Sequence, residues 1–206
     1  MTKENIKTAA ISLFAQNGYE GGKLAEIAKA VHIKTASLYF YFESKEQLFI
    51  ELFDDIRDRK VESLDKLHEE INTMNSVKDQ LYHLYQYFSK RNYEENEEEL
   101  FWKRCTLFPP NFLKEKISQD LISYQSKFID ESLRPMILLG MKSGALKEQN
   151  PEIVIAAFFG IIDALFNEIH YSKQDAYQKK VIMLWEFYWN SLKKWVFYYL
   201  NDSLLN

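Results

Sequence analysis

The sequence contains few of the residues that interrupt helices or cross-link a chain. Only six glycines, four prolines and one cysteine occur among its 206 residues. A single cysteine excludes a disulfide within the chain and suits a reducing compartment. Because helix breakers are scarce while 47% of the residues are hydrophobic, the composition favours an all-α protein of one or two domains.

The sequence also lacks a long hydrophobic run and an apolar leader. Its longest strictly apolar stretch, residues 153–162, ends at Asp163, well short of the roughly 20 residues that a membrane-spanning helix needs. The N-terminal residues MTKENIKTAA are charged from the third position, unlike the core of a signal peptide. We therefore expect a cytoplasmic protein with no membrane partner.

No motif for catalysis or metal binding is present in the sequence. It has no HExxH, no CxxC and no glycine-rich phosphate loop. No histidine follows a glutamate by three positions, as the ligand pairs of di-iron helical bundles do. The isolated Cys105 is more typical of a small core residue than of a nucleophile. We expect no enzymatic activity, no cofactor and no metal.

Apolar residues recur at helical spacing along nearly the whole chain. Asn17-Gly18 should end the first helix, Ser44 and Gln47 form a capping box before the fourth, and Pro135 should interrupt the seventh. The expected helices cover about residues 6–17, 24–30, 35–41, 45–72, 76–91, 97–107, 111–144, 151–171 and 174–200.

The first helices form a recognisable unit. Two short helices joined by a turn of about four residues, after one longer helix, make a helix-turn-helix. Residues 1–50 hold six lysines against five glutamates, whereas the whole chain carries a net charge of −4; this permits DNA binding without demonstrating it. Residues 6–56 resemble the DNA-binding domain of TetR-type transcriptional regulators. The resemblance lies in Phe14, Gly18-Tyr19, Ile27-Ala28, Ile33, Ala36-Ser37-Leu38-Tyr39, Tyr41-Phe42, Lys45 and Leu48.

The resemblance implies an architecture and a function. Residues 1–46 would be the helix-turn-helix domain, and residues 47–206 a larger helical domain for effector binding and dimerisation. A homodimer would bind a palindromic operator in double-stranded DNA as a repressor, and a small apolar or aromatic effector would release it. The rival interpretation is a helical protein-binding or scaffolding protein that does not bind DNA.

Several residues of the helix-turn-helix are expected to contact DNA. By resemblance, Tyr39, Tyr41 and Lys45 bind phosphates, and a lysine in the first turn of a helix makes physical sense if an anion arrives there. Tyr39 and Tyr41 could instead be half-buried packing residues. Gly22 occupies the N-cap position at which the family usually has a threonine that touches phosphate, so Lys23 is the expected substitute.

Base recognition should come from the recognition helix, because its N-terminal turn enters the major groove. Lys34 could donate to guanine, and apolar contact with a thymine methyl would suit Phe40; Phe40 could instead wedge against the fourth helix. His32 stands where the family usually has glycine, and we expect it to be a left-handed C-cap. The candidate base contacts are Lys34, Thr35, Ala36, Ser37 and Phe40.

Two further sets of residues are candidates in the larger domain. Small residues at a spacing of four allow close approach of another helix, and aromatic residues at helical spacing can line a pocket, although either pattern also occurs in an ordinary core. Asp163 could be a polar contact between subunits or a counter-charge for a ligand. The effector-pocket candidates are Tyr85, Phe88, Trp102, Cys105, Phe108, Tyr124, Phe159 and Asp163. The candidates for a dimer interface are Ala156, Gly160, Ala164, Trp185, Tyr188, Trp189 and Leu192.

Overall fold

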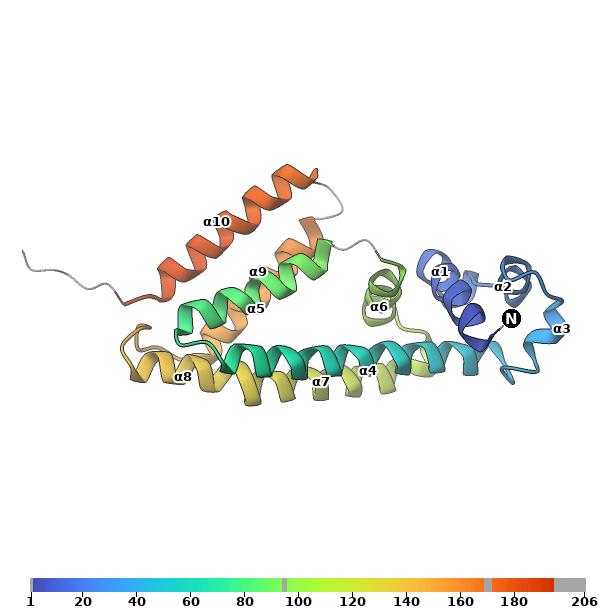
Figure 1. Cartoon of the computed structure of the whole chain (residues 1–206), viewed down its shortest axis with the longest axis horizontal. Coiled ribbons are helices and arrows are strands. Elements are labelled where there is room, and N and C mark those ends of the chain that lie inside the picture. Colours follow the sequence, from blue (N-terminus) through green and yellow to red (C-terminus); the bar gives the residue numbers. More distant parts are fainter. Residues whose placement is uncertain (1, 94–95, 169–171, 195–206) are drawn as a thin grey trace, which may run out of the picture. The chain divides into compact units, whose positions relative to one another are not determined.

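The computed structural model describes residues 2–93, 96–168 and 172–194. Over these residues the protein is all-α, as predicted, and contains no β-strand (Figure 1). A 3-10 turn, Asn111–Leu113, precedes α7, and a π-helical turn, Ile129–Leu133, follows it. The helices are α1 Lys3–Gly21, α2 Leu24–Ala30, α3 Thr35–Leu38, α4 Lys45–Asn72, α5 Val77–Tyr93, α6 Glu97–Leu107, α7 Lys114–Phe128, α8 Arg134–Lys142, α9 Pro151–Glu168 and α10 Gln174–Leu192.

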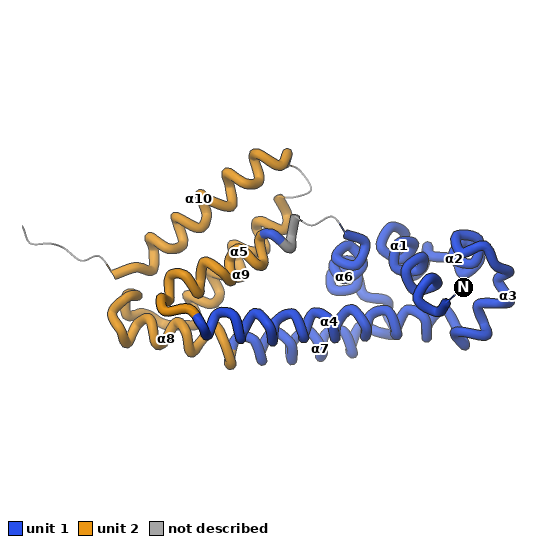
Figure 2. The backbone as a smooth tube through the Cα atoms, viewed as in Figure 1, with its two compact units in different colours: residues 1–73, 90–129 blue, residues 74–89, 130–206 orange. Residues whose placement is uncertain are grey.

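The chain divides into two compact units (Figure 2). Unit 1 comprises residues 1–73 and 90–129 and contains α1–α4, α6 and α7. Unit 2 comprises residues 74–89 and 130–206 and contains most of α5 together with α8–α10. The long helix α4 begins in the helix-turn-helix and continues through unit 1. The boundary near residue 46, between a DNA-binding part and an effector-binding and dimerisation part, does not coincide with the boundary between the compact units. It therefore stays a prediction.

Aromatic side chains hold the helix-turn-helix against α4 and α6 within unit 1. Phe49 of α4 is buried, and its ring centroid lies 5.0 Å from that of Phe14, 5.1 Å from that of Tyr19 and 5.1 Å from that of Phe101. Edge-on and tilted aromatic pairs of this kind contribute about 0.5–1.5 kcal/mol each beyond their buried area. Helices α1, α4 and α6 therefore share one core.

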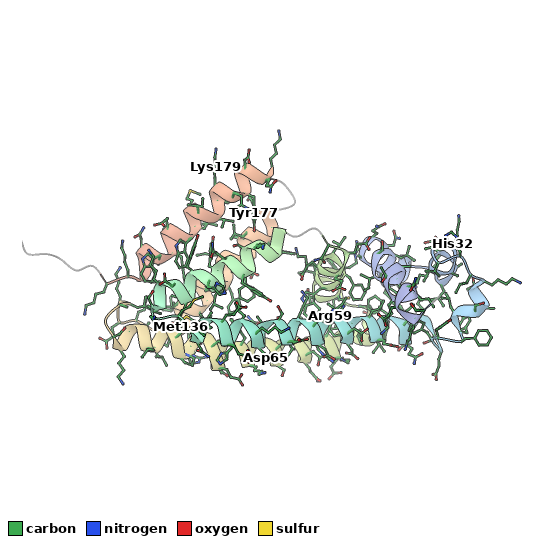
Figure 3. All side chains as sticks on the ribbon, viewed as in Figure 1. His32, Arg59, Asp65, Met136, Tyr177 and Lys179 are labelled. Carbon is green, nitrogen blue, oxygen red and sulfur yellow. The ribbon has the colours of Figure 1, made fainter. Side chains whose placement is uncertain are left out.

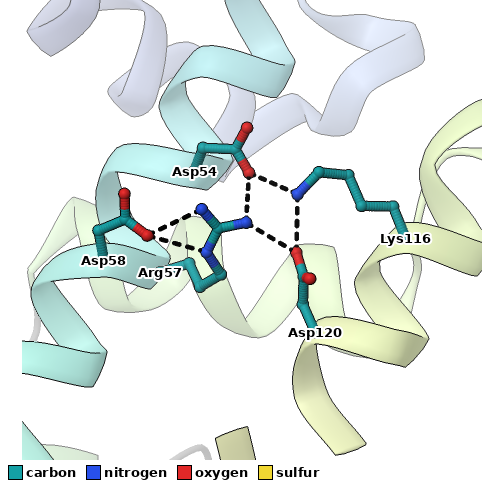
Figure 4. Close-up of polar contacts among 5 residues, drawn as sticks. All are labelled: Asp54, Arg57, Asp58, Lys116 and Asp120. Atoms are coloured by element: carbon teal, nitrogen blue, oxygen red, sulfur yellow. Dashed lines mark hydrogen bonds and ion pairs between the residues drawn. The ribbon is translucent and has the colours of Figure 1, made fainter. Parts of the chain in front are cut away.

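Ion pairs join α4 to its neighbours in unit 1. The Nζ atom of Lys7 in α1 lies 2.8 Å from a Glu51 oxygen and 2.6 Å from an Asp55 oxygen. Toward α7, Figure 4 shows Arg57 and Lys116 each bonded to both Asp54 and Asp120. The remaining side of the Arg57 guanidinium bonds to Asp58. A shared network fixes side-chain geometry better than isolated surface pairs do.

Buried tyrosines organise unit 2. The Tyr85 hydroxyl on α5 donates to the Val181 carbonyl on α10 over 2.7 Å. Tyr177 on α10, labelled in Figure 3, donates to the Ser89 carbonyl over 2.7 Å, and Tyr188 donates to the Val154 carbonyl on α9 over 3.1 Å. Because each hydroxyl has a partner, these large rings are buried without leaving a polar atom unsatisfied.

The first and last predicted helices differ from the structure near their C-terminal ends. The first helix breaks at Gly18, which has a non-helical φ of 70°, as Asn17-Gly18 predicts, but helical turns resume after this kink and continue to Gly21. The last helix ends at Leu192, because Lys193 becomes extended and forms a β-bridge with Leu146. Residues 195–200 of that expected helix lie outside the described residues. So do residues 169–171, with which the preceding helix was expected to end.

The interruption that Pro135 predicts is present. The π-helical turn precedes α8, and Pro135 lies in the first turn of α8. A proline is tolerated in that turn because the first backbone N–H groups of a helix have no partner within it.

Candidate nucleic-acid interface

The turn between α2 and α3 depends on one left-handed residue. His32 has φ 58°, the only positive φ of a non-glycine residue in the described chain. Beyond it the Ile33 N–H donates to the Ala28 carbonyl over 2.9 Å, which is the backbone pattern of a glycine-type helix C-cap. The prediction that His32 is a left-handed C-cap is confirmed.

The recognition helix α3 ends at Leu38 rather than at residue 41 as predicted, and residues 39–41 form a turn after it. The segment 35–42 has one buried and one exposed face, with Leu38 and Phe42 buried in the core of unit 1. Tyr39 is 55% exposed, Phe40 is 88% exposed and Tyr41 is 38% exposed. The alternative in which Phe40 wedges against the fourth helix is therefore wrong, and half-burial fits Tyr41 better than Tyr39.

The remaining candidates for base recognition surround the N-terminus of α3. Lys34 is the N-cap residue, and its exposed side chain makes no capping bond. Ala36 is also exposed, whereas Thr35 and Ser37 are half-buried. The structure thus brings all five candidate residues to one short segment, with Lys34 and Phe40 the most accessible large side chains. Their contacts with bases stay predictions.

Lys45, in the first turn of α4, lies close to the end of α1. Its Nζ atom is 4.4 Å from the centroid of the Tyr19 ring and 3.4 Å from the carbonyl oxygen of Glu20. Ser44 caps the helix by accepting from the Gln47 N–H over 3.0 Å. The Gln47 side chain accepts from the Glu43 N–H rather than from that of Ser44, so the predicted capping box is shifted by one residue.

The start of α2 corrects one prediction. Lys23, not Gly22, is the N-cap residue, and its exposed side chain forms no capping bond. Gly22 instead ends α1, where a Cβ atom would lie 2.4 Å from Cδ1 of Phe14. Close packing against Phe14 therefore explains the glycine. A phosphate contact by Lys23 stays a prediction.

Four of the effector-pocket candidates lie in unit 1. The Trp102 indole stacks on Phe53 of α4, with centroids 5.4 Å and planes 6° apart. Tyr124 donates to the Lys60 carbonyl over 3.4 Å. Phe108 is 78% exposed and lines an open groove of about 300 Å³ near the end of α1. Cys105 is buried, and burial raises the pKa of its thiol to about 12, so it stays protonated and unreactive at neutral pH.

The other four pocket candidates lie in unit 2. Tyr85 is buried, and Phe88 packs edge-on against Phe158 and Phe159. Asp163 is exposed on α9, although partial desolvation raises the pKa of its carboxyl. The eight candidates are thus divided four and four between the two units. That they bind an effector stays a prediction.

The dimer-interface candidates fall into two groups. On α9, Ala156, Gly160 and Ala164 are exposed and free to face another helix. On α10, the side chains of Trp185, Tyr188 and Leu192 are buried within the chain itself, while that of Trp189 is half-buried. The three buried side chains leave little surface for a partner, and contacts of these seven residues with a second subunit stay a prediction.

The exposed apolar face of α10 was missed. Ile182, Met183 and Phe187 are 62%, 61% and 70% exposed. The spacing of Met183 and Phe187 by four residues could have indicated this face. It was hidden because tryptophans and tyrosines on the opposite side give a stronger apolar stripe.

The part of the chain that the structure describes contains neither a metal-binding cluster nor a membrane-spanning helix. No group of three or more histidine, cysteine or acidic side chains is arranged to hold a metal ion there. None of the described helices is both long and apolar enough to cross a bilayer.

The fold and this surface define a helix-turn-helix protein with a helical second part. Residues 6–52 match the family described as bacterial regulatory proteins, tetR family. The negative transcriptional regulator IcaR of the biofilm operon icaADBC from Staphylococcus aureus (strain Newman) is 49% identical over 47 residues. That match covers 23% of this chain and 25% of the length of IcaR. The sequence likeness to the tetR family therefore covers the helix-turn-helix segment.

Solved structures extend the likeness to the whole fold. AibR in complex with isovaleryl coenzyme A and operator DNA superposes with a TM-score of 0.67 at 17% identity, over 90% of this chain and 96% of AibR. A transcriptional regulator from Saccharomonospora viridis in complex with choline gives a TM-score of 0.71 at 18% identity, over 94% and 98% of the two chains. At these identities the likeness shows a shared fold.

Proposed function

We propose that this protein is a one-component transcriptional regulator, a repressor that binds a palindromic operator as a homodimer. The observation that carries the proposal is the recognition helix. Its inner face is locked into a core by Leu38 and Phe42, while Lys34, Tyr39 and Phe40 project into solvent. Exposed aromatic area beside a lysine at the start of a helix suits a DNA groove and is unusual on an inert surface. A cytoplasmic location follows from this role.

Exposed residues on α9 and α10 support the homodimer. The small residues Ala156, Gly160 and Ala164 form a flat stripe, and Met183 and Phe187 add exposed apolar area within unit 2. Large exposed apolar side chains of this kind commonly mark an interface. A palindromic operator requires two recognition helices related by a two-fold axis, which a dimer through this surface supplies.

The relatives agree with a repressor that responds to a small molecule. IcaR is a negative transcriptional regulator, and AibR was solved with both operator DNA and isovaleryl coenzyme A. The fold does not fix the effector, because another structural relative was solved with choline. We propose an apolar or aromatic effector that lowers operator affinity by favouring a different conformation of the dimer.

The DNA-binding role is tested by selecting bound sequences from a random duplex pool and then titrating the selected site at several salt concentrations. The expected result is a palindromic consensus and a steep fall in affinity with salt, because lysines release counterions from phosphates. A protein-binding scaffold would retain no sequence from the pool. An absence of both enrichment and salt dependence would overturn the proposal.

The proposed response to an effector can be tested at Trp102. This residue joins α6 to α4 by stacking on Phe53, and Lys45 is the first residue of the same helix. Trp102→Ala should blunt the effector-induced loss of operator affinity and leave the affinity without effector nearly unchanged. An unaltered response would place the effector pocket elsewhere, and lost operator binding without effector would show that Trp102 is only a core residue.

A further inference from the structure

A groove between α5 and α10 in unit 2 combines aromatic rings with carboxylates. It has a volume of about 330 Å³, at the lower end of the roughly 300–1,000 Å³ typical of small-molecule sites. Its floor includes Tyr82, Tyr85 and Trp185, and its rim includes Asp79 and Glu186 together with Lys78. Tyr85 is a predicted pocket residue and Trp185 a predicted interface residue, and the structure brings their two rings together.

The aromatic floor is rigid. The Trp185 ring centroid lies 4.8 Å from that of Tyr82 and 5.4 Å from that of Tyr85, with both pairs tilted. The Tyr85 hydroxyl is occupied by the Val181 carbonyl, which fixes its ring. Tyr82 remains partly exposed at 38%. A ligand would therefore meet a preformed surface rather than having to order it.

The charges around the groove favour a cation. Two of its three charged side chains are carboxylates. Asp79 is held in place by the Ser76 hydroxyl, which donates to it over 2.7 Å, while Glu186 is exposed on α10. The single cation, Lys78, is directed toward another ring, with its Nζ atom 5.7 Å from the centroid of Trp189. Aromatic faces with acidic neighbours are the usual recognition chemistry for alkylated ammonium groups.

We propose that the α5–α10 groove binds a small organic cation with an alkylated ammonium group, and that this cation is a second effector of the regulator, distinct from the apolar or aromatic effector proposed above. The effector role rests on the proposed function, whereas binding itself does not. Ile182, which is 62% exposed, belongs both to the lining of the groove and to the exposed apolar face of α10, so the groove borders the surface proposed for the dimer.

Calorimetry on the full chain without DNA tests the site itself. Benzyltrimethylammonium chloride should bind once per chain, whereas sodium benzenesulfonate, an aromatic anion of similar size, should not bind at the same ionic strength. Two variants at accessible positions should each weaken cation binding by about two- to five-fold: Tyr82→Leu, which keeps apolar area, and Glu186→Gln. Glu148→Gln makes the same charge change at another exposed position of unit 2 and should have no effect.

Equal binding of cation and anion would overturn the site, and so would a lack of cation binding at millimolar concentration. Equal effects of Glu186→Gln and Glu148→Gln would do the same, because binding would then follow overall charge. A DNA titration with and without the cation tests the effector role separately. Cation binding with unchanged DNA affinity would remove that role, whereas failure to bind DNA even without the cation would overturn the proposed function and leave the site standing.

Discussion

The ammonium group of Lys45 lies over the ring of Tyr19, 4.4 Å from its centroid. The first turn of α4 is thereby held against the end of α1, and the lysine charge is fixed beside free backbone N–H groups that also favour an anion. In the unbound protein the Glu20 carbonyl accepts from the same ammonium. A phosphate arriving here would meet a cation that is already in position.

Lys45→Ala and Tyr39→Phe should weaken binding to all DNA sequences alike, because phosphate contacts carry no base information. The lysine change should also lower the slope of log affinity against log salt by about one unit. Titrations of operator and random duplex at several salt concentrations measure both effects. Lys142→Ala, at an exposed position on α8, is the matched control; if it has the same effect, Lys45 acts only through net charge.

Lys34→Ala should change sequence preference at one base step. Lys34 is exposed at the N-cap of α3, and a good bidentate contact with guanine is worth about 1–3 kcal/mol of discrimination. Selection of binding sites with the variant should therefore show one relaxed position in each half-site. Equal losses of affinity for operator and random DNA would make Lys34 a phosphate contact instead.

His32→Gly should stabilise the protein by about 1 kcal/mol, because a left-handed backbone is strained for a residue with a Cβ atom. The observed φ of 58° carries this expectation. Thermal or urea unfolding measures the change. Ala30→Gly, at the exposed end of α2, provides the opposite control and should destabilise by up to about 1 kcal/mol. Destabilisation by both changes would mean that His32 contributes side-chain contacts that outweigh its strain.

Acid should weaken unit 1 through the network in Figure 4. Burial alone would raise the pKa of Asp120, but hydrogen bonds from Lys116 and Arg57 outweigh it and lower that pKa. A depressed pKa stabilises the folded state above the unfolded value, about 3.9, and this contribution is lost as the pH falls through the folded pKa. The free energy of unfolding should therefore decrease below about pH 4.

The variant Asp120→Asn tests that origin. It should lower the free energy of unfolding at neutral pH by less than about 1 kcal/mol, since the network is partly exposed, and should flatten the acid limb of the stability curve. Denaturant unfolding between about pH 2 and pH 7 measures both. An unchanged acid limb would show that other carboxyls cause the acid sensitivity.

Local signals allowed much of the fold to be predicted. The cap at Ser44 and the helix at Glu97–Leu107 agree with the structure, because both depend on side-chain bonds within one turn. The left-handed His32 likewise follows from backbone chemistry at a single residue. These features need no knowledge of distant contacts.

The errors come from tertiary contacts that the sequence does not display. The end of α10 is set by pairing between Lys193 and Leu146, which are far apart in the chain. Periodicity does not show which face of α10 is buried, because large apolar residues lie on both faces: Trp185 on the buried face and Phe187 on the exposed one. The role of Gly22 is packing against the Phe14 ring. Because this contact forms only in the folded protein, the sequence alone suggests a helix cap instead.

The contact between Gly22 and Phe14 also restricts how this surface can change. Any other residue at position 22 would place a Cβ atom within 2.4 Å of the Phe14 ring, and Phe14 is fully buried. A threonine at position 22 would require the Phe14 ring or the local backbone to move, and such a shift in a close-packed core costs stability. Substitutions that change DNA affinity at this edge of the helix-turn-helix are therefore expected at the neighbouring position 23, where the side chain is exposed.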